Sequence, residues 1–248
     1  MPGVLNKLND WLTVSDPCQK SDVIFVLAGR EYRKRFALRL LQENWAPILL
    51  ISVGRFELRR FSNLKVPASP DLPVLAAATE PPLRHYFVTI RTGNTETRRI
   101  TVRRFGTLSE IKAFAEWLRE HPSIRSAIVV SSGFHLKRVR MCCHHLVPEG
   151  TTLHFVAAPE EGQPALGSWR WDSDGRSLIL PEVAKVAMYR LLCQNVIARA
   201  RRLSNLTRRG TRAGGARLEE SISQGHLALV TSSVKIHTRV ARTKRVKG

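Results

Sequence analysis

Two short apolar runs near the start of the chain, separated by a segment with helical spacing, constrain the fold more than any other feature. The runs cover residues 22–28 (DVIFVLA) and 48–53 (ILLISV), and residues 31–44 between them carry apolar side chains at helical intervals. Unbroken apolar runs are typical of strands buried on both faces of a parallel sheet, and the connection between two such strands is right-handed. The chain is therefore predicted to begin with a β-α-β unit.

The rest of the sequence predicts further elements of the same kinds. We expect strands over residues 85–90, 99–103, 127–130 and 152–157, and helices around 72–75 and over 55–61, 107–120, 134–146 and 181–202. Gly93 and Asn94 are the expected turn between the first two of these strands. Thr107 is a candidate N-cap, and Glu110 follows three residues later to complete a capping box. This alternation of strands and helices predicts an α/β fold with a mostly parallel sheet.

Length and charge divide the chain into a domain and a tail. The 248 residues, 43% of them hydrophobic, suit one α/β domain with additional segments. Of the formal net charge of +20, residues 199–248 hold +11, from thirteen lysines and arginines and two glutamates. We therefore predict a helical lead-in over residues 1–21, an α/β domain over 22–198 and a basic, partly disordered C-terminal tail over 199–248.

The sequence also limits location and metal chemistry. No apolar run is long enough to span a bilayer, and the N-terminus has no signal-peptide core, so we expect a cytoplasmic protein. The four cysteines have no disulfide-framework spacing. The run Cys142-Cys143-His144-His145 is not expected to bind a metal, because neighbouring helical side chains point about 100° apart and cannot all face one ion.

The ends of the predicted strands carry the residues that indicate chemistry. Ser131 and Ser132 follow a buried apolar run, and His135 and Arg138 come one turn apart on the next helix. Ligands of open α/β sheets bind just beyond the carboxyl ends of the strands, where helix N–H groups, hydroxyls and cations can hold an anion. The candidate ligand-binding residues are Gly29, Arg30, Arg35, Ser52, Gly54, Thr107, Ser131, Ser132 and Arg138. Phosphate or pyrophosphate fits this set best, because arginine pairs with phosphate oxygens through forked donors.

His135 is the candidate catalytic acid or base, since histidine titrates near neutral pH, and Glu110 is the candidate group that orients it. A serine hydrolase is disfavoured because no Gly-x-Ser-x-Gly elbow surrounds the serines. The Gly-x-Gly-x-x-Gly and Walker A patterns are also missing, which argues against ordinary dinucleotide or P-loop binding. The simplest alternative is structural: a Ser-Gly turn followed by a surface helix.

Taken in order, these residues resemble the YdcF/SanA/ElyC-like family of bacterial domains. The matching positions are Asp16-Pro17 with Ser21-Asp22, the strand end 26–29, Arg35, Ser52-Val53-Gly54, Thr107 with Glu110, and Ser132, His135 and Arg138. The chain departs from the family by having one glycine at 28–30, by Ile111 and Lys112 where an asparagine often follows, and by showing no membrane anchor. The resemblance implies a Rossmann-like three-layer αβα fold for residues 16–189.

The resemblance further implies a role in cell-envelope or exopolysaccharide metabolism, with a phosphorylated small molecule or a lipid-linked precursor as partner, and a place near the inner membrane. One member type is associated with S-adenosylmethionine, so a non-catalytic nucleotide-binding module is the alternative. A third alternative is binding of nucleic acid or an acidic membrane through the basic tail. The sequence assigns no cofactor and no oligomeric state.

Overall fold

The computed structural model describes residues 7, 11–58, 64, 71–92, 94–103, 105–159 and 181–194. The chain divides into two compact units, Met1–Cys193 and Gln194–Gly248, and the fold below is that of the first. The predicted basic tail lies outside the described residues. Across the described ranges, we find no helix with the length and apolar character needed to cross a membrane.

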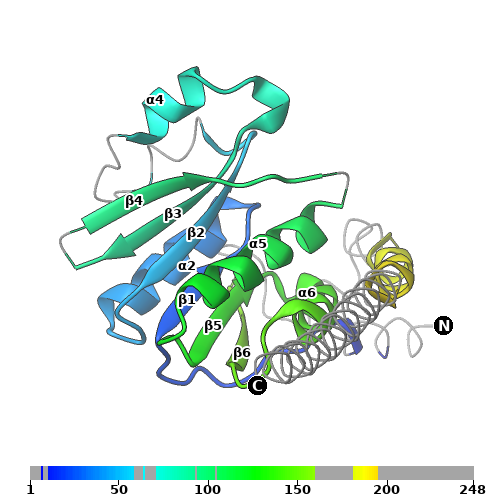
Figure 1. Ribbon diagram of the computed structural model, residues 1–248. Helices are drawn as coiled ribbons and strands as arrows, with labels where there is room; N and C mark the ends of the chain where they lie inside the picture. The colour runs from blue at the N-terminus through cyan, green and yellow to red at the C-terminus, as the bar shows by residue number, and fades with distance from the viewer. Residues whose placement is uncertain are drawn as a thin grey trace, which may run out of the picture. The chain divides into compact units, whose positions relative to one another are not determined.

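A six-stranded sheet forms the centre of the first unit, in the order β4-β3-β2-β1-β5-β6 (Figure 1). Its strands are β1 (Val23–Val26), β2 (Leu49–Gly54), β3 (His85–Arg91), β4 (Asn94–Arg99), β5 (Ser126–Ser131) and β6 (Thr152–Ala157). β2, β1, β5 and β6 are parallel, whereas β3 and β4 form a hairpin that pairs antiparallel with β2. The prediction of an α/β fold with a mostly parallel sheet is confirmed.

Helices cover both faces of this sheet and give the three-layer, Rossmann-like arrangement (Figure 1). The helices are α2 (Glu31–Gln42), α4 (Asp71–Ala77), α5 (Gly106–Glu120), α6 (Gly133–Leu146) and a further helix over 181–194; η1 (Pro81–Leu83) is a single 3₁₀ turn. Apolar residues of α2 and α4 pack on one face, and those of α5, α6 and the helix over 181–194 pack on the other.

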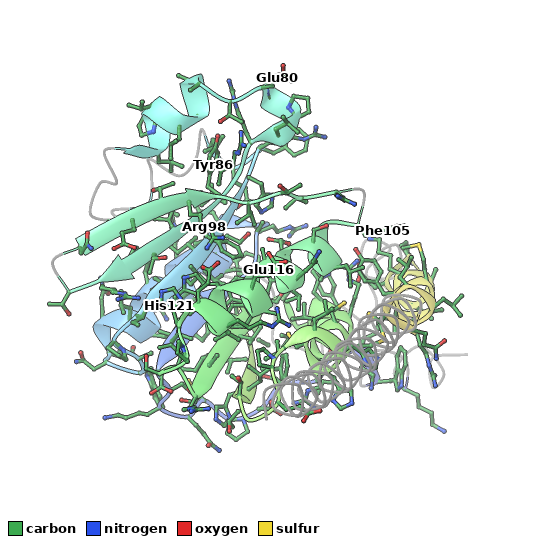
Figure 2. The ribbon with its side chains drawn as sticks, in the orientation of Figure 1. Glu80, Tyr86, Arg98, Phe105, Glu116 and His121 are labelled. Atoms are coloured by element: carbon green, nitrogen blue, oxygen red, sulfur yellow. The ribbon has the colours of Figure 1, made fainter. Side chains whose placement is uncertain are left out.

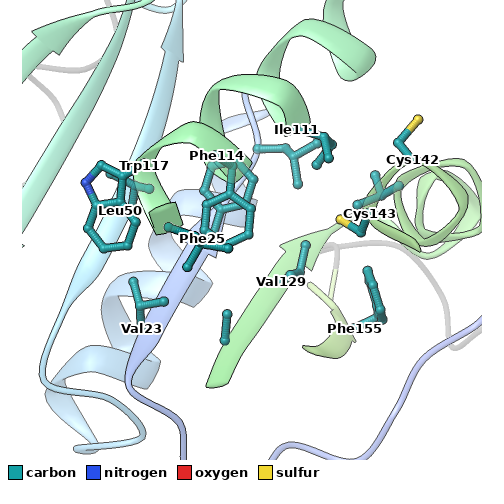
Figure 3. Packing of buried hydrophobic residues seen from close by; sticks show 14 of the residues in the cluster. Val23, Phe25, Leu50, Ile111, Phe114, Trp117, Val129, Cys142, Cys143 and Phe155 are labelled. Carbon is teal, nitrogen blue, oxygen red and sulfur yellow. The ribbon is translucent and has the colours of Figure 1, made fainter. Parts of the chain in front are cut away.

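Aromatic stacking fixes α5 against the middle of the sheet. The ring of Phe25 on β1 stacks on Phe114 of α5 with centroids 4.2 Å apart, and it meets Phe87 of β3 edge-on at 5.7 Å. Figure 3 shows the rings of Phe25 and Phe114 among other buried side chains of this face. Each such aromatic pair contributes about 1 kcal/mol beyond its buried area. This packing fixes the first turns of α5 near the ends of β1 and β2.

Two sequence expectations about this region are wrong. The strand predicted over 99–103 is instead β4, which starts at Asn94 and ends at Arg99. β4 is an edge strand of alternating half-buried and exposed polar residues, so no apolar run marks it. Arg98 of this strand, labelled in Figure 2, forms an ion pair with Glu120 of α5.

The predicted capping box at the start of α5 is also wrong. α5 begins at Gly106 with Phe105 as its N-cap, and no side chain caps it. Glu110 does not reach back to the helix start, because its carboxylate turns into the interior below the strand ends. Of the short helix expected over 55–61, residues 55–57 form a turn, Leu58 is helical, and residues 59–61 lie outside the described part.

The connections of the sheet reverse direction between β1 and β5. From β1 the chain crosses through α2 to β2 on one side, and from β5 it crosses through α6 to β6 on the other. In doubly wound sheets, ligands bind at such a reversal, in the crevice outside the carboxyl ends of the strands. The loop after β1 and the start of α6 therefore border the expected binding site.

Candidate functional site

The loop that joins β1 to α2, residues 27–30 and here called the β1 loop, forms the middle of the site. Gly29 has a φ of 137°, a conformation that side chains other than glycine rarely adopt. A Cβ on Gly29 would lie 2.7 Å from Nη1 of Arg33, so the guanidinium packs directly against the glycine. The loop therefore needs glycine both for its backbone conformation and for the close approach of Arg33.

Two successive N–H groups of the β1 loop donate hydrogen bonds to carboxylates from different elements. The Ala28 N–H donates to Oε1 of Glu110 at 3.0 Å, and the Gly29 N–H donates to Oε1 of Glu57 at 2.5 Å. Neighbouring N–H groups that point the same way form a concavity that binds anions. Here each of the two N–H groups is already bonded to one of the protein's own carboxylates.

On the side of the loop that faces β2, here called the β2 side, Glu110 is fully buried and well bonded. The Ser52 hydroxyl donates to Glu110 Oε1 at 2.5 Å and accepts from His85 Nε2 at 2.8 Å. Burial alone would raise the pKa of the Glu110 carboxyl, but the bonds from His85, Ser52 and the Ala28 N–H outweigh burial and lower it. Glu110 is therefore a buried anion with each of its donors in place.

This arrangement is not a nucleophilic triad. Ser52 has no exposed surface and gives its proton to Glu110, and the Glu110 oxygen lies 3.4 Å from the same His85 nitrogen that contacts Ser52. In a triad the carboxylate holds the opposite ring nitrogen, so that the histidine can take the serine proton. We therefore assign Ser52, His85 and Glu110 a structural role beneath the loop.

Next to this cluster, Lys34 and Glu57 border a pocket of about 320 Å³. Lys34 is almost completely buried and forms an ion pair with Glu57 Oε2. Burial raises the pKa of the Glu57 carboxyl, and the nearby Glu110 adds to the rise, against the lowering effects of Lys34 and the Gly29 N–H. Phe56 and Leu64 form the apolar part of the pocket wall.

On the opposite side of the β1 loop, here called the β5 side, Arg33 is buried without a carboxylate partner. Its Nε donates to the Ser132 hydroxyl at 2.9 Å and its Nη1 donates to the Ala28 carbonyl at 3.1 Å. The Tyr32 hydroxyl lies 2.5 Å from the same Ser132 oxygen. Within the described ranges, no carboxylate forms an ion pair with Arg33, although the residue is only 6% exposed.

His135 and Arg138 lie beside Arg33 and meet Glu182 from the helix over 181–194. Arg138 Nη2 donates to His135 Nδ1 at 2.6 Å, while Oε2 of Glu182 lies 3.3 Å from that nitrogen and 3.5 Å from Arg138 Nη2. Burial lowers the pKa of His135, and the charges of Arg33 and Arg138 lower it further against the opposing effect of Glu182. The imidazole is therefore neutral at pH 7, with its proton on Nε2.

Three buried polar atoms of the β5 side have no hydrogen-bond partner among the described residues: Ser131 Oγ, Arg138 Nε and Glu182 Oε2, the last of which lies within ion-pair distance of His135 and Arg138. Ser131 is 1% exposed and ends β5, one residue before Ser132. Leaving a buried polar group unpaired costs about 1–3 kcal/mol, so unpaired groups cluster where a ligand completes them. Among the described residues, the β5 side therefore leaves buried polar groups unsatisfied.

The structure brings most of the predicted site residues to this edge, on the two sides of the β1 loop. Gly29, Ser52 and Gly54 lie on the β2 side, where Arg30 borders the pocket, and Ser131, Ser132, His135 and Arg138 lie on the β5 side. Thr107 is hydrogen-bonded to the Tyr189 hydroxyl rather than to the loop.

Two of the predicted roles are wrong. Arg35 is a surface residue that pairs with Glu31 at 2.7 Å, with its side chain 54% exposed, so it does not face the site. The carboxylate beside His135 is Glu182, whereas Glu110 contacts His85.

Sequence reasoning missed five residues that the structure places here: Arg33, Lys34, Glu57, His85 and Glu182. A signal existed for Arg33, because Arg33, Ala37 and Leu40 recur at helical spacing and all three are buried on α2. A charged residue on a buried stripe is unusual enough to have pointed to the site.

The side chains of the run Cys142-Cys143-His144-His145 on α6 point in different directions, as expected for successive helical residues. Both thiols lie in the core, and Cys142 Sγ is 3.9 Å from Cys193 Sγ, while His144 is exposed. In the part of the chain that the structure describes, no three His, Cys, Asp or Glu side chains are grouped to hold a metal ion.

Comparison with known proteins adds no assignment to this geometry: no protein-family model, curated protein or solved structure matches the chain.

Proposed function

We propose that this chain binds a phosphorylated ligand on the β5 side of the β1 loop, at the carboxyl ends of β1 and β5. Arg33 and Arg138 supply the charge, and the hydroxyls of Ser131 and Ser132 supply further hydrogen bonds. The N-terminus of α6, which begins at Gly133, faces the same edge and favours an anion there.

The buried charge of Arg33, which no carboxylate of the described residues pairs with, supports this proposal most strongly. Buried charges in proteins are paired or coordinated, because an isolated one costs several kcal/mol. Around Arg33 the described residues supply a hydroxyl and a carbonyl but no anion, and nearby Arg138 shares Glu182 with Lys185. An anionic ligand supplies the missing charge, and phosphate matches the forked geometry of arginine donors.

Neutral His135 suits such a ligand. Its Nδ1 accepts from Arg138, which leaves the Nε2 proton as the ring's remaining donor. A neutral imidazole that donates a hydrogen bond can stabilise charge on a phosphate oxygen or protonate a leaving group. We therefore propose His135 as the acid in any reaction at this site, with Arg138 and Glu182 as the groups that position it.

The proposal also keeps the relationship to the YdcF/SanA/ElyC-like family. It is supported by the placement of Ser132, His135 and Arg138 together at the start of α6, beside the glycine of the β1 loop. On this basis the ligand is a phosphorylated intermediate of cell-envelope or exopolysaccharide metabolism, either free or attached to a lipid carrier.

Arg33→Met tests the proposed site against a matched control, Arg35→Met, on the same helix. Pyrophosphate binding is measured by isothermal titration calorimetry at pH 7 for the wild type and both variants. We expect Arg33→Met to weaken binding about thirtyfold, the effect of losing one buried charge-assisted contact. Arg35→Met should change it by less than about twofold, because an exposed, paired arginine contributes little.

Equal losses in the two variants would mean that pyrophosphate is attracted only by the overall positive charge of the chain. That result would contradict the proposal, as would wild-type binding that Arg33→Met leaves intact.

A further inference from the structure

The Glu57 carboxylate has the contacts that a bound anion would make. One oxygen accepts the Gly29 N–H and the other pairs with the buried ammonium of Lys34. These are a backbone N–H and a cation, the donors that phosphate sites in proteins combine. Glu57 comes from the turn after β2, a different element from the one that supplies its donors.

The space beside this carboxylate is large enough for a small organic molecule. The pocket of about 320 Å³ extends from Gly29, Lys34 and Glu57 to Phe56 and Leu64. Phe56 is 79% exposed, and its ring lies 4.3 Å below the guanidinium of Arg55. A charged end and an exposed aromatic wall in one pocket suit a ligand with an anionic group at one end and a flat apolar group at the other.

We propose that this pocket, here called the Lys34 pocket, binds an aryl or similarly apolar phosphate whose anionic group replaces the Glu57 carboxylate on Gly29 and Lys34. Glu57 is then a built-in competitor that sets how tightly the pocket holds its ligand. This inference extends the proposed function to the β2 side of the loop and rests on it in one respect, that the ligand is an anion.

How much Glu57 weakens ligand binding depends on the fraction of time that its carboxylate occupies the Gly29 and Lys34 donors. A site that is open for only a fraction of the time binds more weakly by that fraction. The binding of the Glu57 carboxylate to Gly29 and Lys34 is weakened, because burial and the nearby Glu110 both disfavour its charged form and raise its pKa. If Glu57 occupies the donors about nine-tenths of the time, removing it tightens binding about tenfold.

Glu57→Ala and Glu57→Gln test the inference, with phenyl phosphate and inorganic phosphate as probes in calorimetric titrations of the full chain. We expect both variants to bind phenyl phosphate about tenfold more tightly than the wild type. Glu43→Gln is the matched control, since it removes an exposed carboxylate at the other end of α2, where it accepts a hydrogen bond from Trp45. Its effect should stay within about twofold. Phe56→Ala should abolish the preference for phenyl phosphate over inorganic phosphate.

The inference is overturned if the Glu57 variants bind phenyl phosphate no more tightly than the wild type does, or if Glu43→Gln tightens binding equally. The same titrations on Arg33→Met separate the two proposals. Binding that depends on Arg33 but ignores Glu57 supports the β5-side site and rejects the Lys34 pocket. Binding that is tightened by Glu57→Ala but indifferent to Arg33 does the reverse.

Discussion

The two sides of the β1 loop differ in how their charges are matched. On the β2 side, one lysine and two glutamates are joined by hydrogen bonds to each other, to Ser52 or to the loop. On the β5 side, Arg138 and Lys185 share the carboxylate of Glu182, and Arg33 pairs with no carboxylate among the described residues. Both sides are buried at the same strand edge, so burial does not explain the difference.

The two sides differ in whether the protein itself supplies the anions that neutralise its buried positive charges. On the β2 side the protein supplies its own anions, and the loop's N–H groups are already occupied. On the β5 side, Arg33 and Arg138 are buried with the single carboxylate of Glu182, and three buried polar atoms have no hydrogen-bond partner among the described residues. Such an arrangement does not favour the stability of the fold, and an anionic ligand would neutralise the buried charge of the β5 side.

The largest expected effect is on the β2 side. Glu110→Ala leaves the Ala28 N–H and the Ser52 hydroxyl without their buried acceptor, and we expect the free energy of unfolding to fall by about 3 kcal/mol. Urea unfolding at pH 7 measures it. Glu116→Ala on the same helix removes an exposed carboxylate and should cost less than about 0.5 kcal/mol. Similar costs for the two variants would show that internal pairing does not hold this side together.

A smaller, pH-dependent effect is expected for Glu182 on the β5 side. Burial alone would raise the pKa of this carboxyl, but His135, Lys185 and Arg138 together lower it from 4.5 to about 2. A carboxyl whose pKa is lower in the folded state stabilises the fold above its unfolded pKa. That stability is lost as the pH falls through 4.5 toward 2.

Glu182→Gln should therefore lower the free energy of unfolding by about 2 kcal/mol at pH 7. The difference from the wild type should disappear as the pH approaches 2. Denaturant titrations across this pH range measure both quantities. A difference that stays constant with pH would mean that the charge of Glu182 does not stabilise the cluster.

The smallest expected effect is a difference in stability between variants of two neighbouring residues of α2, one on each side of the loop. Lys34→Met removes the partner of Glu57 and should cost about 1.5 kcal/mol, since the buried carboxylate is left unpaired. Arg33→Met removes a charge that has no carboxylate partner and should change stability by less than about 0.5 kcal/mol. Thermal and urea unfolding of the two variants measure the contrast. Equal costs would mean that Arg33 is held as firmly as Lys34.

Much of the fold could be predicted from the sequence because its central strands are strongly patterned. The apolar runs around Phe25, Ile51, Val129 and Phe155 mark the four parallel strands, and each was expected within two residues of its observed position. β4 was misplaced because an exposed edge strand needs no apolar run. Its polar residues could be assigned only through their pairing with β3.

The location of the candidate site could be predicted from the sequence, but the pairing of its side chains could not. Spacing along the strands placed Gly29, Ser132 and His135 at one edge, since parallel strands end together. Spacing could not say which carboxylate meets which base, because Glu182 reaches His135 from a helix 47 positions further along the chain. Arg35 is the predicted arginine of the helix after the first strand, but the helical period of α2 places Arg33 on the buried stripe.

The direction of β3 has a consequence for the origin of site residues. Parallel strands deliver side chains to this edge from the point where each strand stops, but β3 runs the other way and delivers its first residue, His85, opposite Gly54. The hairpin thus brings the segment that precedes a strand, through η1 and α4, to an edge otherwise built from segments that follow strands. Insertions or deletions between Gly54 and His85 therefore shift the His85 imidazole that contacts Ser52 and Glu110, while the parallel strands keep their pairing.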